Sequence, residues 1–372
     1  MNCSDFTQQK RVPRWPGRFL VTVLSGLILF ACFQTRGQNT PSPEVFYVNN
    51  KIGSDVFDGR NPECGTGNSG PFKSIMQAIQ KCSVGARIEI ANTGTDYRET
   101  VEISGLKKGQ ADAPLIIDGH GAVVNGLLPI APEQWQHFRD DIYYFDNRVG
   151  GSDYKPRGWF DKKTGDSYYG PMPRNIWLTG RTGWFTEKEA PKAPQIFLVN
   201  GKPGPNVVKL EDLPPGGFFY DVKRTTLKDL PKCLFFRLPE KTELKDCVVE
   251  LPQNDGIFVN DDYVTVQNIG SCYGVEDGFH GWRGQNVVFR NIHAFCNSEQ
   301  GMSFHSIGST FVDGGLIENN AGSGIVDVMS SLSIYRNVTV RNNNPLGVLF
   351  KGVAHAMYGC RIEDNGGAQI SV

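Results

Sequence analysis

Long amphipathic helices are almost absent from this chain of 372 residues. The chain holds 43 Gly and 22 Pro, which are the two residue types that disfavour helix interiors. Short runs of β-branched and aromatic residues alternate with turn residues instead. The composition therefore argues against an α-helical protein and favours an all-β one.

Two further absences narrow the function. No two cysteines have the close spacing of a zinc site, and no cluster of Cys and His occurs in the chain. Lys and Arg also form no cluster, and the formal net charge is −1. A surface of this kind does not attract nucleic acid, which is therefore not an expected partner.

One apolar run stands at the N-terminus. Arg11, Arg14 and Arg18 precede residues 19–33, which is about fifteen residues and short for a membrane span. We predict a signal peptide over residues 1–37 and a mature chain without a transmembrane span. It would carry 33 Lys and Arg against 38 Asp and Glu, a formal charge of −5. The protein is then secreted or periplasmic. Lipoprotein anchoring at Cys32 is the alternative, although Phe30 is bulky where a small residue is usual.

The C-terminal third repeats itself in steps of about 23 residues. The register is marked by Gly256, Gly278, Gly301, Gly324, Gly347 and Ala368. Asparagine recurs ten residues before the glycine at Asn268, Asn291 and Asn337, and four before it at Asn297, Asn320 and Asn343, with Asn365 nearby in the last turn. Strands that return at this period without intervening helices predict a parallel β solenoid, whose coils bury their apolar faces by stacking.

The rest of the chain divides around this repeat. Residues 38–44 read as a linker, residues 45–129 as an N-terminal cap with the first coils, residues 130–254 as an aromatic-rich insertion, and residues 255–372 as regular coils. Ile75, Ala78 and Ile79 have helical spacing and predict the helix of the cap. The tryptophans of the insertion form either a small separate core or platforms for sugar rings.

Strand alternation predicts which side chains face inward. Residues one position after the register glycine are apolar and are expected to form an internal ladder: Ile257, Phe279, Met302, Ile325 and Val348. Residues two and four positions after it then face outward. They are expected to form two neighbouring columns: Phe258, His280, Ser303, Val326 and Leu349, and Asn260, Trp282, His305, Val328 and Lys351.

The outward columns hold the candidate catalytic residues. His280 and His305 come from neighbouring coils, and histidine is the side chain most easily poised for proton transfer near neutral pH. Trp282 offers a flat surface for a sugar ring, and Asn260 is a further substrate-binding candidate. Lys351 and Arg283 are candidates for neutralising a substrate carboxylate or for acting as the base.

Carboxylates near the same coils suggest a cation. Asp261, Asp262 and Asp277 offer hard oxygen ligands, so one interpretation is a Ca²⁺ site and the other is that these residues form turns. Asp327 is unusual because its position should point inward. It is expected to mark either a local change of register or a catalytic acid close to His305.

The opening of the predicted mature chain carries a family resemblance. It consists of a strand at Val45-Phe-Tyr-Val, a turn at Gly53-Ser-Asp, a strand at Pro71-Phe-Lys-Ser-Ile and a short helix. Together with the coils and the insertion, it resembles exported carbohydrate-active proteins with a right-handed parallel β-helix, of the pectate-lyase-like and chondroitinase-B-like kind. The lysine and arginine of the latter have only loose counterparts in Lys351 and Arg283. The three-aspartate signature of polygalacturonases is absent.

The resemblance implies a polysaccharide as partner. It favours a lyase or epimerase that acts on an acidic glycan by proton abstraction. The alternatives are a glycoside hydrolase with paired carboxylates and a non-catalytic β-helix that binds a glycan.

Overall fold

The computed structural model describes residues 42–146, 159–160, 167–168, 197–207, 209–220 and 233–372. Residues Pro43–Val372 form one compact unit. The predicted signal peptide lies outside the described residues, as do Trp177 and Trp184 of the insertion. No helix in the described ranges is long and apolar enough to cross a membrane.

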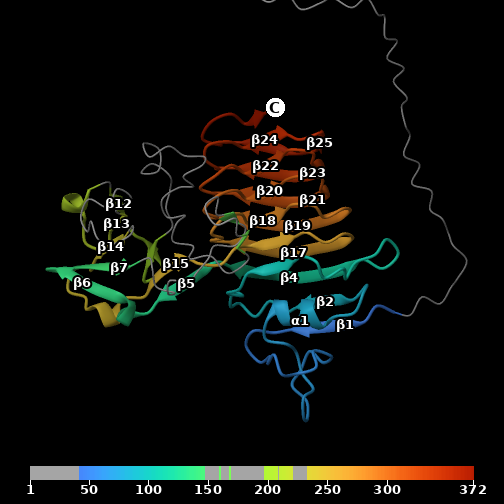
Figure 1. Cartoon of the computed structure of the whole chain (residues 1–372), viewed down its shortest axis with the longest axis horizontal. Coiled ribbons are helices and arrows are strands. Elements are labelled where there is room, and N and C mark those ends of the chain that lie inside the picture. The colour runs from blue at the N-terminus through green and yellow to red at the C-terminus, as the bar shows by residue number, and fades with distance from the viewer. Residues whose placement is uncertain (1–41, 147–158, 161–166, 169–196, 208, 221–232) are drawn as a thin grey trace, which may run out of the picture. The chain divides into compact units, whose positions relative to one another are not determined.

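Two parallel sheets form the body of the molecule (Figure 1). The long-strand sheet contains, in order, β1 (Val45–Val48), β2 (Arg87–Ile90), β4 (Leu115–Asn125), β17 (Val264–Cys272), β19 (Val287–Phe295), β21 (Ser309–Glu318), β23 (Leu332–Arg341) and β25 (Ala354–Tyr358), with β26 (Arg361–Glu363) also on β23. The short-strand sheet contains β3 (Val101–Ile103), β16 (Ile257–Val259), β18 (Phe279–Gly281), β20 (Met302–Phe304), β22 (Ile325–Val328), β24 (Val348–Lys351) and β27 (Ile370–Ser371).

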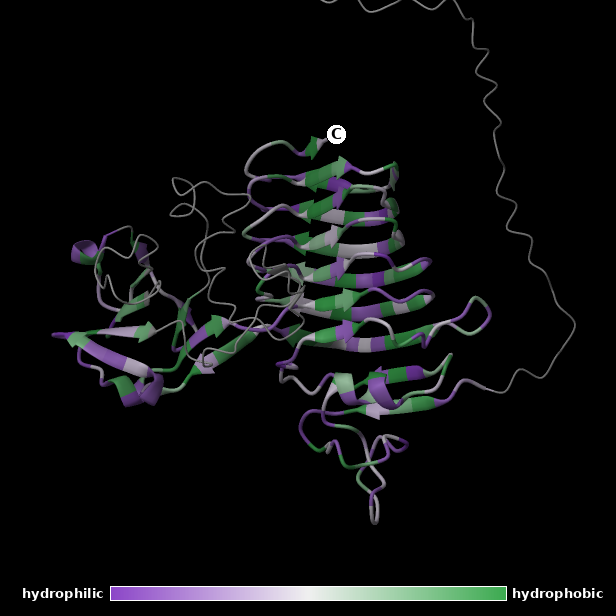
Figure 2. Cartoon of the chain, in the orientation of Figure 1, coloured by the Kyte–Doolittle hydropathy of each residue, from purple (hydrophilic) through white to green (hydrophobic). Residues whose placement is uncertain are grey.

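Each 23-residue repeat contributes one strand to each sheet. Phe279 pairs with Met302, and Met302 pairs with Ile325, so a residue meets its counterpart one repeat later. Apolar and polar residues alternate along the strands (Figure 2). The right-handed parallel β-helix predicted from the repeat is confirmed, with regular coils from β16 onward.

The predicted internal ladder is present. The strand pairings run without a shift through Ile257, Phe279, Met302, Ile325 and Val348. All five side chains are at most 2% exposed and belong to one hydrophobic cluster that extends from the first strand to the last coils. The inner and outer faces of the short strands are therefore the ones that strand alternation predicts.

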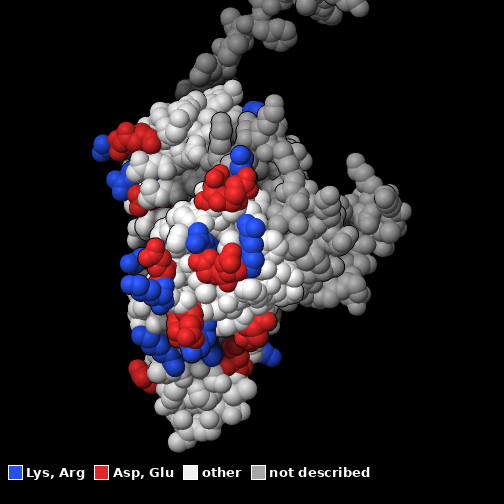
Figure 3. Space-filling view, turned by 90° about the vertical axis from the view of Figure 1, so that its left-hand side faces the viewer, with Lys and Arg blue, Asp and Glu red and all other residues white. Residues whose placement is uncertain are grey.

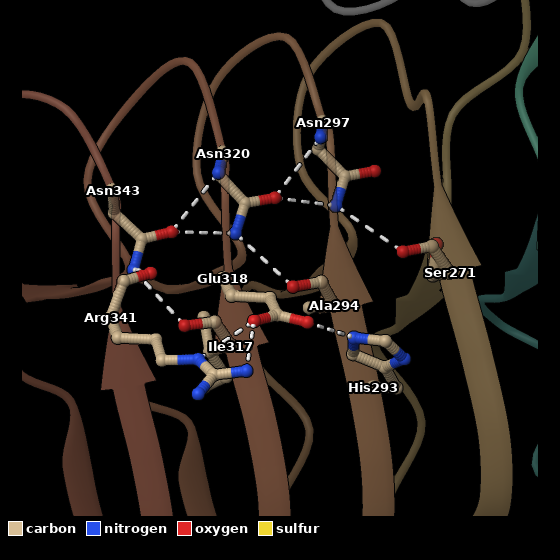
Figure 4. A network of polar contacts seen from close by, with 9 residues as sticks. All are labelled: Ser271, His293, Ala294, Asn297, Ile317, Glu318, Asn320, Arg341 and Asn343. Carbon is tan, nitrogen blue, oxygen red and sulfur yellow. Dashed lines mark hydrogen bonds and ion pairs between the residues drawn. The ribbon is translucent and has the colours of Figure 1, made fainter. Parts of the chain in front are cut away.

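The asparagines four residues before Gly301, Gly324 and Gly347 form a buried ladder (Figure 4). The amide oxygen of Asn320 accepts hydrogen bonds from the backbone N–H and the Nδ2 of Asn297, at 3.0 and 2.8 Å. Its own Nδ2 donates to the carbonyl of Ala294 and to Oδ1 of Asn343, at 3.2 and 2.8 Å. Each asparagine thus satisfies backbone groups of the turn and binds the next coil.

This ladder also explains the register glycine. A Cβ added at Gly301 would lie 2.3 Å from Cγ2 of Ile317 and 2.8 Å from Nδ2 of Asn320. One added at Gly324 would lie 2.4 Å from Cγ1 of Val340 and 2.9 Å from Nδ2 of Asn343. A side chain in place of the glycine of one coil would therefore clash with the asparagine amide and with an apolar core side chain of the next coil. Glycine and asparagine recur together because the amide occupies space that a Cβ would take.

The ladder predicts a large effect on stability. We expect Asn320→Ala to lower the free energy of unfolding by about 2–3 kcal/mol, because it leaves buried donors and acceptors of both neighbouring coils unsatisfied. Denaturant unfolding measures the loss. The matched control is Asn319→Gly, which changes the adjacent exposed residue at a φ of 56° that glycine adopts freely. Equal stability of the two variants would contradict the role assigned to the ladder.

The other row of asparagines serves a different purpose. Asn268, Asn291 and Asn337 have φ values of 52°, 48° and 57°, and the equivalent positions are Gly314 and Gly359 with φ of 74° and 61°. Asparagine and glycine are the residues that most readily adopt this left-handed conformation. This row marks a sharp bend inside each long strand.

The N-terminal region contains the predicted helix as α1 (Ile75–Lys81). Ser74 caps it by accepting a hydrogen bond from the N–H of Gln77, and Asp55 accepts from the N–H groups of Lys73 and Ser74. The helix buries Ile75, Ala78 and Ile79 in the main core cluster. Its function as a cap for the end of the solenoid stays a prediction.

The insertion adds antiparallel pairing that the coils lack. One of its sheets has the order β11-β10-β15-β5, another β12-β13-β14-β7-β6, and a third pairs β8 with β9. The bounds are β5 Leu127–Ile130, β6 Trp135–Arg139, β7 Ile142–Asp146, β8 Trp159–Phe160, β9 Ser167–Tyr168, β10 Leu198–Val199, β11 Lys202–Pro203, β12 Asn206–Val207, β13 Phe218–Tyr220, β14 Cys233–Arg237 and β15 Val249–Pro252. Within the described part of the insertion, 3-10 turns at Pro132–Gln134, Leu210–Asp212 and Leu244–Asp246 accompany them.

The insertion has its own hydrophobic core. Trp135 is 6% exposed and packs against Phe145 and Phe236, with ring centroids 5.8 and 5.5 Å apart. For this tryptophan the structure supports the separate-core interpretation over the sugar platform.

Candidate active site on the short-strand sheet

The outer face of the short-strand sheet carries the predicted columns. Strand pairing places Phe258 beside His280, His280 beside Ser303, and Ser303 beside Val326, with Leu349 next. One further member was missed by the sequence interpretation. Glu102 of β3 pairs with Phe258 and extends the column toward the N-terminus. Its neighbours Val101 and Ile103 are buried, so alternation directs Glu102 outward.

A buried carboxylate holds the first histidine. Nδ1 of His280 lies 2.8 Å from Oδ2 of Asp277, and the two side chains are 16% and 3% exposed. The other oxygen of Asp277 accepts a hydrogen bond from the backbone N–H of Gln300 at 3.0 Å. Because a carboxylate only accepts, it favours the tautomer of His280 that carries its proton on Nδ1.

Three rings stack on this face. The imidazoles of His280 and His305 have ring centroids 5.2 Å apart. The indole centroid of Trp282 lies 5.2 Å from the imidazole centroid of His305, with the two ring planes 21° apart. Trp282 remains 39% exposed. The structure therefore brings together His280, His305 and Trp282, as the alternation of the strands predicted.

Two more side chains border the stack. Oγ of the buried Ser303 lies 2.7 Å from Nε2 of His305, so each histidine has a fixed polar partner. The ring of Phe258 meets His280 edge-on, with centroids 4.8 Å apart. Both imidazoles are consequently held in defined orientations rather than left to rotate in solvent.

Asn260 stabilises the turn that carries Trp282. Its amide oxygen accepts hydrogen bonds from the N–H groups of Trp282 and Arg283, at 2.9 and 3.2 Å. The side chain thus fixes the turn that presents the indole. Direct contact of Asn260 with a substrate stays a prediction. The side chain of Arg283 begins at the same turn and is exposed.

Lys351 lies farther from the stack than the other candidates. It pairs with Val328, which follows the Asp327 that pairs with Phe304. His305 follows Phe304, so Lys351 stands two strands away from His305 in the same column. It is exposed, and no ion pair joins it to another described residue.

The predicted metal ligands are occupied by other contacts. Asp261 accepts hydrogen bonds from the backbone N–H groups of Gly105, Leu106 and Lys107 at 2.6–2.7 Å, and it is 6% exposed. Asp262 accepts from the N–H of Gln285 at 2.7 Å. These contacts match the turn-forming alternative. Calcium binding by Asp261, Asp262 and Asp277 stays a prediction.

A different group of possible ligands lies on the long-strand sheet. Glu89, Asp118 and His120 bring their ligand atoms within 4.8 Å of one another. However, Arg87 forms ion pairs with both carboxylates, and Gln267 also donates to Asp118. The guanidinium already supplies the positive charge that a cation would bring.

Asp327 marks neither a change of register nor a catalytic acid close to His305, the two expectations from the sequence. Its strand keeps the register, and its side chain is fully buried inside the solenoid. The carboxylate accepts hydrogen bonds from the hydroxyls of Ser333 and Tyr335 and lies 3.4 Å from Nδ1 of His355. Burial first, and then the neighbouring Asp327, raise the pKa of the Tyr335 hydroxyl well above its usual value. The aspartate is part of the core and is not a partner of His305.

Charge is mixed on the face that Figure 3 displays, where acidic and basic side chains lie next to one another. Ion pairs between neighbouring coils, such as Arg336 with Asp313 and Arg341 with Glu318, also place opposite charges side by side. A mixed face of this kind gives no extended field of one sign.

Comparisons with known proteins find one family match and two weak structural similarities. Two solved structures resemble the chain: "The complex structure of XylC with xylose", with 12% identity over 86% of this chain and 68% of that chain at a TM-score of 0.46, and "Glycoside hydrolase", with 11% identity over 84% and 76% at 0.48. These weak similarities carry no argument about activity. No curated protein matches the chain. Residues 234–372 match the family described as "Right handed beta helix region", and within this range the coils from β16 onward form the right-handed β-helix.

Proposed function

We propose that this protein is an exported enzyme that cleaves an acidic polysaccharide by β-elimination on the outer face of the short-strand sheet. The observation that carries the proposal is the stack of His280, His305 and Trp282, in which His280 is held by the buried Asp277. Two oriented imidazoles beside an exposed indole provide proton transfer and sugar binding at one place.

The proposed chemistry begins with proton removal. In a uronic acid the C5 proton is acidified by the adjacent carboxylate, and a base removes it while the glycosidic oxygen at C4 leaves. With its proton on Nδ1, His280 carries the lone pair of a base on Nε2, and Asp277 stabilises the imidazolium that forms. Nε2 is buried in this structure, so the proposed step requires that substrate binding uncovers it. His305, one strand away, is the group placed to return a proton to the leaving oxygen. Arg283 is the candidate for neutralising the carboxylate of this sugar.

The geometry favours elimination over epimerisation. An epimerase must take a proton from one face of the sugar and return one to the other face. His280 and His305 both rise from the same face of the same sheet, with imidazole planes only 25° apart. A sugar lying on Trp282 would present one face to both groups, which suits removal and donation on the same side.

The test is a screen of the protein against acidic and neutral polysaccharides with two readouts. Elimination creates an unsaturated sugar that absorbs ultraviolet light, so we expect rising absorbance with an acidic polysaccharide. Release of reducing sugar without this absorbance would overturn the proposal in favour of a glycoside hydrolase. Binding without turnover would overturn it in favour of a glycan-binding protein.

The tryptophan gives a prediction on binding. We expect Trp282→Ala to raise KM roughly 2- to 10-fold, since stacking on an aromatic ring contributes about 0.5–1.5 kcal/mol. The change in kcat should be smaller, because the indole takes no part in proton transfer. Tyr358→Ala serves as the control, as it removes another exposed aromatic ring from the long-strand sheet. A variant Trp282→Ala with an unchanged KM would remove the indole from the substrate site.

A further inference from the structure

The two outward columns have opposite charges at their ends. The first runs through Glu102, Phe258, His280, Ser303, Val326 and Leu349, and the second through Ser104, Asn260, Trp282, His305, Val328 and Lys351. In both columns the only acidic side chain is Glu102 on β3, and the only primary amine is Lys351 on β24. The histidine pair lies between them on β18 and in the turn after β20.

Both charges stand at the same offset from the histidines. Glu102 is two strands before His280, and Lys351 is two strands after His305. Neighbouring strands lie about 4.8 Å apart, so each offset is about 10 Å along the solenoid axis. This exceeds the width of one sugar ring. Neither charge is therefore centred on the sugar that lies over the histidines.

The surface between the histidines and each charge also differs. Toward Lys351 it consists of the partly exposed aliphatic side chains of Val328 and Leu349, beside the largely buried Val326, and it fits the C–H face of a sugar ring. Toward Glu102 it consists of Phe258 and the Asn260–Ser104 pair, whose side-chain atoms are 3.5 Å apart. The two sides thus form chemically distinct subsites.

We propose that Lys351 determines specificity by binding the carboxylate of a neighbouring sugar unit, and that Glu102 excludes a carboxylate from the opposite side. This inference rests on the proposed function, because it assumes that the glycan lies along the two columns. The substrate is then a polysaccharide with uronate units toward β24 and an uncharged unit at β3. Its direction along the solenoid is set by charge, over a span of about 24 Å from β3 to β24.

This assignment changes the role given to Lys351. A lysine that acts as the base must reach the reacting carbon, whereas Lys351 starts two strands away from the histidine pair. A lysine that binds the next carboxylate needs only to be exposed and beside an apolar ring surface, and Lys351 meets both conditions.

The experiment compares charged and neutralised probes. Dissociation constants are measured for oligosaccharides of polygalacturonate, alginate and hyaluronan, each with free carboxylates and as the methyl ester. For the free acids we expect Lys351→Met to weaken binding roughly 2- to 5-fold, the range of an exposed ion pair, and Glu102→Gln to strengthen it by a similar factor. Binding of the esters should change in neither variant.

Lys245→Met is the control, because Lys245 is an exposed lysine of the insertion that pairs with Glu243. Equal effects on acids and esters, changes of the same sign in both variants, or no binding of any probe would each overturn the inference. The proposed function fails separately. If the wild-type protein binds the acids with this charge dependence but forms no unsaturated product, the roles of Lys351 and Glu102 stand and the proposed β-elimination is wrong.

Discussion

The double variant His280→Ala/His305→Ala is expected to lower kcat/KM on the acidic substrate by about 10²–10⁴-fold, which is the usual contribution of general acid–base groups. The two imidazoles are stacked with centroids 5.2 Å apart, and His280 and His305 are each held by a buried partner, Asp277 and Ser303. Their loss removes both proton-transfer groups. The rate of ultraviolet absorbance increase measures the effect.

His293→Ala is the matched control for this variant. His293 is also a histidine in a carboxylate pair, with Glu318 at 3.1 Å, but it lies on the long-strand sheet. It should leave kcat/KM unchanged. Thermal unfolding of both proteins separates loss of activity from loss of structure. Near-normal turnover by the double variant would place the reaction elsewhere, with the carboxylates around Asp261 and Asp277 as the next candidates.

Phe279→Ala is expected to lower the free energy of unfolding by about 3–5 kcal/mol, as found for buried aromatic residues. Phe279 is fully buried, and its ring packs edge-on against Phe289, with centroids 5.4 Å apart. It stands in the middle of the internal ladder, between Ile257 and Met302, so the neighbouring coils cannot close over the cavity. Denaturant titration measures the loss.

Phe311→Ala provides the comparison for the core variant. Phe311 lies on the long-strand sheet, is half-buried, and contacts the guanidinium of Arg336. Its truncation removes a similar volume but leaves no internal cavity, so the destabilisation should be clearly smaller. If Phe279→Ala unfolds like the wild-type protein, the inward assignment of its column is wrong. The outward assignment of His280 then fails with it.

The repeat made the fold and the central columns predictable. Once the glycines fixed the register, strand alternation alone placed His280 beside Ser303 and directed Trp282 outward. A one-residue error would have reversed every face, and the buried position of Phe279 shows that none occurred. The same alternation predicted the inward direction of Asp327.

Contacts outside the repeat could not be predicted in this way. Glu102 lies in the same column as Phe258, but the insertion separates the two in sequence. No periodic pattern links them. The contact of Asp277 with His280 depends on how one turn bends before β18 begins. Asp261 looked like a ligand because its three backbone donors belong to residues 105–107, far away along the chain.

Because each coil has about 23 residues, insertion or deletion of a coil changes the distance between two side chains on the outer face by one strand spacing. Because the glycine–asparagine contacts repeat from coil to coil, removing residues 324–346 would join Ser323 to Gly347 in the same register. Val348 would then pair with Met302, and Lys351 would move from two strands to one strand away from His305. Gain or loss of one coil would thus shift a charge by about one strand spacing while leaving the histidine pair in place. In a solenoid of this kind, the spacing between ligand-binding side chains is therefore a multiple of the distance between neighbouring strands.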